Sequence, residues 1–341
     1  MRIWQRSTDD PNERAAAVFA AALCGIGGAM KRNKTAKSLN QNGMWKRTAI
    51  TYLMILPGLI YFIINNILPM YGITLAFRDV SYKLGPLNSP FYPLEDLFIN
   101  FEMIFKQDII GILLRNTLMY NLIFIVLDIV VPVAVAILFN SIENATSKKI
   151  FQTAILLPNI ISWVIVGYIG YAFLSEKSGV ISHLLGVTDF YHNPGYWPLI
   201  LTVFHLWKCL GMGMVIYVSA LVGIDTSMYE AAKLDGATWW QRTVHITLPH
   251  LKKMIITMFI LSLAKIMTSD FGLFYQLPMN SSYLKDITQT LDVYVFNNLV
   301  GNDPNIGLNA AVSAFQSVVG FVLVILANFV IRKVDEESAL F

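Results

Sequence analysis

The sequence predicts an all-α integral membrane protein with six membrane-spanning helices. Of its 341 residues, 55% are hydrophobic and only 14% are charged, whereas soluble domains carry about 25% charged residues. Six segments each offer the roughly 20 mainly apolar residues that a transmembrane helix needs. These predicted spans cover residues 49–70, 116–139, 150–174, 197–222, 254–275 and 308–331.

The distribution of positive charge predicts the orientation of these spans. Cytoplasmic loops of membrane proteins carry an excess of Lys and Arg. Seventeen Lys and Arg residues fall on the side of the two termini, and six fall on the other side. We therefore expect both termini to be cytoplasmic, together with the polar loop 223–252 and the short tail 335–341.

The first 47 residues contain a second kind of apolar segment, "AAAVFAAALCGIGGAM" (Ala15–Met30). It is short for a span, and Ala and Gly contribute little transfer free energy per residue. A signal peptide is a rival interpretation, but the acidic "DDPNE" lies where such a peptide is basic. We expect residues 1–47 to form a cytoplasmic or interfacial segment. A seventh span or a misassigned start site is the alternative.

Several classes of site are missing from the sequence. The two cysteines, Cys24 and Cys209, are too far apart in sequence to indicate a metal site or a disulfide framework. The chain contains no Gly-rich motif of the kind that holds nucleotide phosphates, and no metal-hydrolase motif. A net charge of +3 does not indicate nucleic-acid binding. We expect the chain itself to bind neither ATP nor a metal ion.

The sequence of the loop between the fourth and fifth spans predicts two short helices, each with its own N-terminal cap. Ser227 with Glu230, and Thr238 with Gln241, have the spacing of capping boxes, in which two side chains satisfy backbone N–H groups reciprocally. The predicted helices cover residues 228–235 and 239–246.

A sharp turn is predicted between these two helices. Gly236 stands where a helix end favours a left-handed residue, a conformation that glycine adopts without a Cβ penalty. Pro249 suits the first turn of the following span, where its missing N–H has no cost. The first helix presents small Ala231 and Ala232 beside acidic Glu230 and Asp235. Such a surface suits close docking of a partner, although packing on the protein's own bundle is an open alternative.

The stretch "EAAKLDGATWWQRTVHITLP" resembles the signature of permease subunits of binding-protein-dependent ABC importers. That signature reads Glu-Ala-Ala, three residues, Gly, nine residues, Ile, one residue, Leu-Pro. Every position is matched here without a gap, by Glu230, Ala231, Ala232, Gly236, Ile246, Leu248 and Pro249. The resemblance implies that this loop, Asp235 included, holds the coupling helix that docks on a separate ATPase subunit.

The resemblance covers most of residues 48–334 and is strongest to the carbohydrate branch of these permeases, in particular the LplB-like group. "YLMILPGLIYFIINNILPMYGITLAFRD" and "FQTAILLPNIISWVIVG" are among the stretches that carry it. It implies a six-helix transmembrane domain of a type I ABC importer in a bacterial plasma membrane, itself not an enzyme. The implied partners are a second, homologous permease, an ATPase dimer that uses ATP and Mg²⁺, membrane lipid, an extracytoplasmic solute-binding protein and an oligosaccharide or polysaccharide fragment.

Ionisable residues within predicted spans are candidate functional groups because burying charge in a membrane is costly. Asp128 lies four residues before Pro132 and requires a donor from another helix, a water or its own proton. Lys208 follows Trp207, and an aromatic ring beside a donor suits a sugar. Lys265 and Asp270 are expected on the fifth span.

The third and sixth spans add aromatic and polar candidates. Trp163 and Tyr168 offer rings, and Gln316 is the strongly polar group in the middle of the last span. For all these candidates, a structural role inside the bundle is the alternative to substrate contact. The candidate sugar contacts are thus Asp128, Trp163, Tyr168, Trp207, Lys208 and Gln316.

Two other functions are compatible with parts of the pattern. The same importer class could carry a polyol or a glycerol phosphate ester. An ion-coupled carrier or a channel would need a chain of intramembrane acids, and only Asp128 and Asp270 are available.

Overall fold

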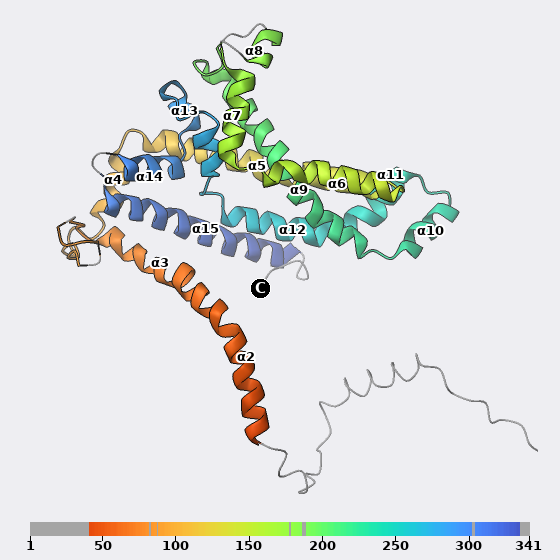
Figure 1. Ribbon diagram of the computed structural model, residues 1–341, viewed down its shortest axis with the longest axis horizontal. Coiled ribbons are helices and arrows are strands. Elements are labelled where there is room, and N and C mark those ends of the chain that lie inside the picture. Colours follow the sequence, from red (N-terminus) through yellow and green to blue (C-terminus); the bar gives the residue numbers. More distant parts are fainter. Residues whose placement is uncertain are drawn as a thin grey trace, which may run out of the picture. The chain divides into compact units, whose positions relative to one another are not determined.

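The computed structural model describes residues 41–81, 83–86, 88–176, 179–185, 189–301 and 304–334, and these form helices joined by connections of which the longest runs from Arg78 to Phe98 (Figure 1). Within these described ranges, five helices are long and apolar enough to cross a membrane, or six if one bent pair counts as a single span. Residues 1–40 of the predicted segment 1–47 lie outside the described residues, and so does the predicted tail 335–341.

The chain divides into two units, one ending at Ile67 and one beginning at Leu68. In the first unit, α2 (Gln41–Phe62) continues into the π-helix η1 (Ile63–Ile67). The second unit begins with α3 (Leu68–Met70) and η2 (Tyr71–Phe77). It holds all the remaining elements.

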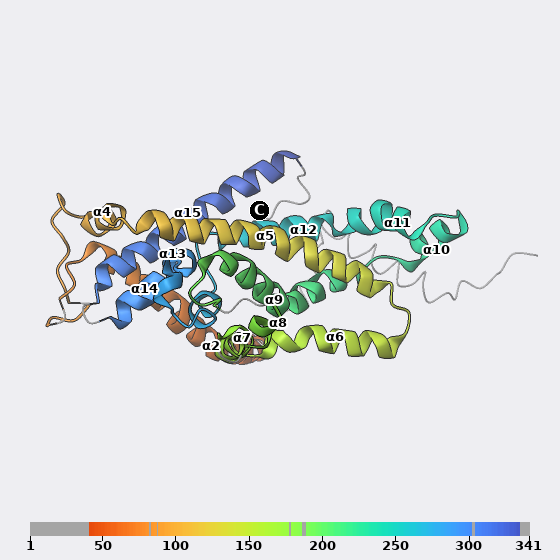
Figure 2. The same cartoon turned by 90° about the horizontal axis from the view of Figure 1, so that it is seen from above.

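The core of the second unit is a bundle of long helices: α5 (Ile110–Asn140), α6 (Ala145–Ile160), α9 (Trp197–Val222), α12 (Leu248–Ala264) and α15 (Ile306–Val334). α9 packs against α5 and α6, and α12 packs against α15 (Figure 2). Gly211 permits the close approach of α9 to α6, because a Cβ there would collide with the carbonyl oxygen of Ile155. Buried apolar side chains of α5 and α9, such as Phe124 and Leu201, fill the interior.

Shorter elements lie toward the end of the bundle farthest from α10 (Thr226–Leu234), among them α4 (Ile99–Lys106), α13 (Lys285–Thr288) and α14 (Leu291–Val300) (Figures 1 and 2). By contrast, α8 (Val180–Leu185) lies away from that end (Figure 1). The remaining short elements are η3 (Pro194–Tyr196) and η6 (Ser282–Leu284). The Asn116 amide on α5 donates to the carbonyls of Asp286 and Gln289. This side chain thereby ties the segment around α13 to the bundle.

The predicted third span, residues 150–174, is not one straight helix. It is split into α6 and α7 (Trp163–Leu174), which meet at 97°. Pro158 lies in the last turn of α6, and Ser162 begins α7 by accepting a hydrogen bond from Ile165 N–H. Lys208 Nζ on α9 donates to the carbonyls of Pro158, Asn159 and Ile161. The break leaves these carbonyls without helical N–H partners, and the buried Lys208 stabilises it by donating to them.

The predicted fifth span, residues 254–275, also needs correction. The helix ends at Ala264, and the chain turns before the π-helix η5 (Gly272–Gln276). Asn121 Nδ2 donates to the carbonyls of Ile266 and Thr268 at 2.8 and 3.0 Å. Lys265 is the residue that follows the helix, and Asp270 accepts from Gly272 N–H at the start of η5. The sequence predicts both residues on a continuous fifth span, and this prediction was wrong.

Replacing Lys208 by Met should destabilise the bundle, because the carbonyls at the end of α6 lose their buried donor. Hydrogen bonds to a charged group contribute about 2 kcal/mol, so the melting temperature of the purified protein in detergent should fall by several degrees. Lys149→Met, on the exposed side of α6, is the matched control and should melt like the wild type. Equal melting of the two variants would contradict this role.

Candidate functional site

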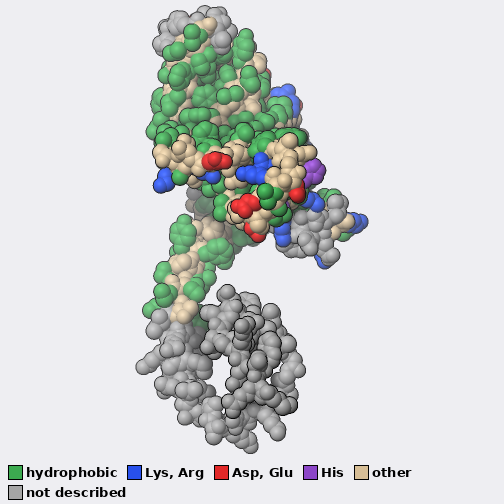
Figure 3. Space-filling view, turned by 90° about the vertical axis from the view of Figure 1, so that its right-hand side faces the viewer, with side chains coloured by type: hydrophobic (Ala, Val, Ile, Leu, Met, Phe, Trp, Pro, Cys, Tyr) green, Lys and Arg blue, Asp and Glu red, His purple; other side chains and the backbone are tan. Residues whose placement is uncertain are grey.

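The polar insert, residues 226–247, lies at the far end of the bundle and contains α10 (Thr226–Leu234) and α11 (Trp239–Arg242) (Figure 1). Figure 3 looks onto this end, where charged side chains gather, while hydrophobic side chains predominate over the helices beside it. Leu234 is 90% exposed although it is hydrophobic. The surface of α10 thus combines an exposed leucine with charged and small side chains.

The two helices of the insert begin with different caps. At Thr238 the predicted capping box with Gln241 is confirmed. At α10 the prediction was wrong, because the cap is Asp225, whose carboxylate accepts from Ser227 N–H at 2.9 Å. This hydrogen bond holds the pKa of Asp225 below its usual value. The cap is therefore formed at neutral pH and is lost as the pH falls through that lowered pKa.

The turn between the helices has the geometry that the sequence predicts. Gly236 has φ of +78°. Ala237 N–H donates to the Ala232 carbonyl at 2.9 Å, and Gly236 N–H donates to the Lys233 carbonyl at 3.1 Å. These two bonds form a Schellman motif, which fixes the direction in which the chain leaves α10.

One side-chain hydrogen bond ties α10 to η4 within the insert, and another holds the insert to the bundle. Tyr229 on α10 bonds to Thr247 at 2.9 Å, and Trp239 Nε1 donates to Ser141 Oγ, just after α5, at 2.9 Å. The predicted helix 239–246 is not separate, because α11 continues through the π-helix η4 (Thr243–Thr247) into α12. A proline two residues into α12, Pro249, lacks the N–H that a regular α-helix would use, which fits the wider turn before it.

The residues of the sequence signature fall into two groups. Glu230, Ala231 and Asp235 are exposed on α10, whereas Ile246 is half-buried against the bundle. A hollow of about 450 Å³ between the two helices is lined by Ala232, Asp235, Gly236, Gln241, Ile246 and neighbouring residues. The signature thus includes exposed residues on α10, the glycine of the turn and an isoleucine that packs against the bundle.

Within the bundle, Asp128 pairs with His205, which the sequence did not single out as a contact. His205 Nε2 lies 3.0 Å from the carboxylate, and its ring stacks on Phe124 at 3.9 Å. Asp128 also lines a cavity of about 310 Å³ with Asn159, Cys209, Met212, Tyr217 and Ser262. The hydrogen-bonding partner of Asp128 therefore comes from another helix. The spacing of two residues on different helices gives no signal for such a pair.

The other predicted sugar contacts do not converge on this cavity. Lys208 lies 5.2 Å from the Trp163 ring, and Trp163 Nε1 donates to Asp270 at 2.8 Å. Gln316 is buried and donates to the Met267 carbonyl at 2.6 Å. By contrast, Tyr168 is 62% exposed and Trp207 is 40% exposed. Three of the candidates therefore already have structural partners, while two rings face outward.

Residues 109–336 match the protein family described as the binding-protein-dependent transport system inner membrane component. The chain belongs to this family. It is therefore a transport permease and a multi-pass membrane protein, as its apolar helices also indicate.

Known relatives of this permease match over nearly their whole length. It is 33% identical to Protein LplB of Bacillus subtilis over 89% of this chain and 94% of that protein. It is also 33% identical to the B. subtilis polygalacturonan/rhamnogalacturonan transport system permease YteP, over 84% and 89% of the two chains. A bacterial alginate ABC transporter, solved with an alginate pentasaccharide-bound periplasmic protein, contains a chain with the same fold. The TM-score is 0.73 and the identity 26%, over 85% of this chain and 96% of that chain.

Substitutions of Gly236 should disturb the insert in a graded order. No atom lies near a Cβ built at Gly236, so the cost comes from the backbone conformation, about 1–2 kcal/mol for an ordinary residue. Asn tolerates this conformation better than Ala or Val. The Ala237 amide should exchange its hydrogen slightly faster in Gly236→Asn and roughly tenfold faster in Gly236→Val. Unchanged exchange in Gly236→Val would show that the turn does not depend on glycine.

Proposed function

We propose that this chain is one permease subunit of an ATP-driven importer for an oligosaccharide or polysaccharide fragment. The insert carries this proposal, because it exposes Glu230 and Leu234 while the Tyr229 bond holds α10 to η4 and the Trp239 bond holds the insert to the end of α5. An exposed face that is fixed in position suits the docking of a partner protein. The printed names of the relatives, which refer to polygalacturonan, rhamnogalacturonan and alginate, support a sugar polymer as the class of substrate.

The partner that covers the insert would be a separate ATPase dimer, which alone would bind ATP and Mg²⁺. The excess of Lys and Arg on the side of the insert supports a cytoplasmic location for it and for both termini. A second, homologous permease would complete the transmembrane pathway. A solute-binding protein would deliver the sugar on the opposite side of the membrane, which in bacteria is extracytoplasmic.

Coupling would run from the insert to the helices of the bundle. When the ATPase dimer closes on ATP, it would draw α10 with it. The Trp239 bond would then pull on the end of α5, and the Tyr229 bond would pull on the end of η4, which continues into α12. These helices would then rock as a rigid body against the second permease and change which side of the membrane the cavity faces. The permease would have two states, with the cavity open to one side of the membrane or to the other. Nucleotide bound to the ATPase and sugar-loaded binding protein on the opposite side would both shift the equilibrium between these states.

The sugar would meet the two outward-facing rings and the Asp128 cavity. Tyr168 and Trp207 offer flat faces to the C–H groups of a sugar ring. Asp128 offers carboxylate oxygens to sugar hydroxyls. Trp163, Lys208 and Gln316 would act indirectly by holding the broken helices in place.

Changing Glu230 to Lys should abolish uptake of a labelled oligosaccharide by the complete importer, because a reversed charge on the exposed face of α10 would prevent docking. Glu230→Gln, which keeps the shape, should retain part of the activity. Membrane insertion should be normal in both, as judged by the amount of chain extracted from membranes. Wild-type uptake by Glu230→Lys would remove α10 from the docking surface.

A further inference from the structure

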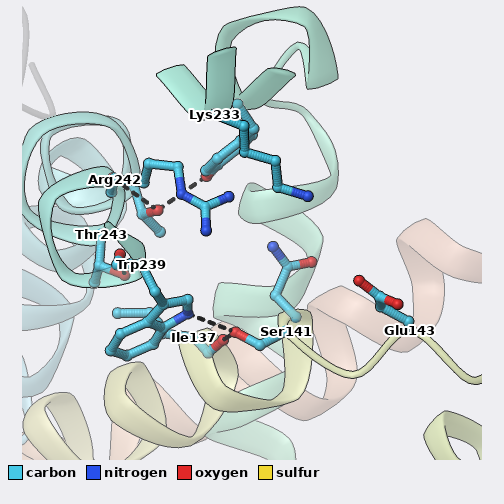
Figure 4. A pocket seen from close by; sticks show the side chains of 10 residues that line it. Ile137, Ser141, Glu143, Lys233, Trp239, Arg242 and Thr243 are labelled. Carbon is cyan, nitrogen blue, oxygen red and sulfur yellow. Dashed lines mark hydrogen bonds between the residues drawn. The ribbon is translucent and has the colours of Figure 1, made fainter. Parts of the chain in front are cut away.

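A second pocket, here called the insert pocket, lies between the insert and the end of α5 (Figure 4). Its volume is about 330 Å³, which is at the lower end of the range for small-molecule sites. Its walls come from three places along the chain, listed in order as Ile137, Asn140, Ser141, Glu143, Tyr229, Lys233, Trp239, Arg242, Thr243 and Thr247.

Two positive side chains of the insert pocket have no negative partner. Arg242 and Lys233 extend toward the same space in Figure 4. Neither takes part in any ion pair found among the described residues, and Arg242 Nε is buried without a hydrogen-bond acceptor. A buried, unpaired guanidinium N–H is unusual because it loses its water without gaining a partner. An anion in the insert pocket would supply the missing acceptor and balance both charges.

The number and kind of donors favour a phosphate ester. Two cations match the charge of about −1.5 to −2 on a phosphate monoester, and a guanidinium fits phosphate oxygens with two parallel N–H bonds. The Asn140 amide adds a further donor from the end of α5.

The remaining wall suits the hydroxyl groups of a polyol. Glu143 lies on the loop after α5, apart from Arg242 in Figure 4. A carboxylate only accepts hydrogen bonds, so at this place it would bind hydroxyls and repel a second phosphate. Trp239 has its N–H occupied by Ser141 and so offers the pocket an apolar ring.

We propose that the insert pocket binds a phosphorylated polyol, with the phosphate on Arg242 and Lys233 and the hydroxyls on Glu143. The ligand would be a free sugar phosphate or the headgroup of an anionic phospholipid, because both present anionic phosphate oxygens. Phosphatidylglycerol presents hydroxyl groups as well, although the phosphodiester of a lipid carries one negative charge and not two. It would bridge Lys233 on α10 and Arg242 on α11 across the turn at Gly236. Binding would thus stiffen the insert and modulate its docking. This inference concerns a site other than the transported sugar's and does not depend on that sugar.

The test uses the complete importer in phosphatidylcholine nanodiscs, with radiolabelled glucose 6-phosphate as the probe and glucose as the control. Saturable binding of the phosphate ester, and none of glucose, is expected. Arg242→Gln should weaken it roughly tenfold or more, since it removes charged hydrogen bonds. Arg242→Lys should weaken it less. Lys253→Gln, an exposed lysine of α12 outside the pocket, should bind like the wild type.

A second arm distinguishes a lipid source. In nanodiscs that also contain phosphatidylglycerol, native mass spectrometry should then detect retained phosphatidylglycerol in the wild type and in Lys253→Gln but not in Arg242→Gln. Either arm supports the proposal. It is overturned if neither probe binds, or if Lys253→Gln loses as much binding as Arg242→Gln. It is also overturned if Arg242→Gln prevents assembly with the ATPase while the wild type binds neither probe, because the pocket then belongs to a protein partner.

Discussion

The structure depends on one constraint: a backbone carbonyl freed by a break in a membrane helix must find a donor inside the protein. Lys208 supplies that donor where α6 ends, and Asn121 supplies it where α12 ends. Gln316 adds a third donor at the Met267 carbonyl. Because these side chains come from other helices, each break is held in place by the packing of the bundle. Two broken spans can then turn the chain inside the membrane region without exposing polar backbone to lipid.

The same helix that stabilises one break also holds the insert, so the two ends of the molecule are joined mechanically. α5 carries Asn116 and Asn121 near one end, where they bond to carbonyls of the segments that follow α12. Just beyond its other end, Ser141 accepts the Trp239 hydrogen bond of the insert. A displacement of the insert would therefore be transmitted along α5 to the segments that follow α12. This connection gives the permease a continuous physical route from the insert to the broken spans.

Most features set by neighbouring residues could be predicted from the sequence, and features set by distant ones could not. The turn at Gly236 and the Thr238 cap follow from residues within four positions of one another. The break at 161–162 depends on Lys208, which lies 47 positions from Ile161. The end of α12 depends on Asn121, which lies 145 positions from Ile266. The cap of α10 was misplaced because Asp225 and Ser227 are both good caps two residues apart. Likewise, Asp128 indicated a need for a donor, but only the packing of α5 on α9 identified His205.

The central claim is that the insert and the bundle move as one body. Spin labels at Leu234 on α10 and Leu138 on α5, both exposed, would test it in the complete importer with its native cysteines replaced. Double electron–electron resonance should give the same distance distribution without nucleotide and with ATP trapped, while the ATPase remains active before trapping. A shift of about 5 Å, one helical turn, between the two nucleotide states would show that the insert moves independently of α5 and would contradict the account.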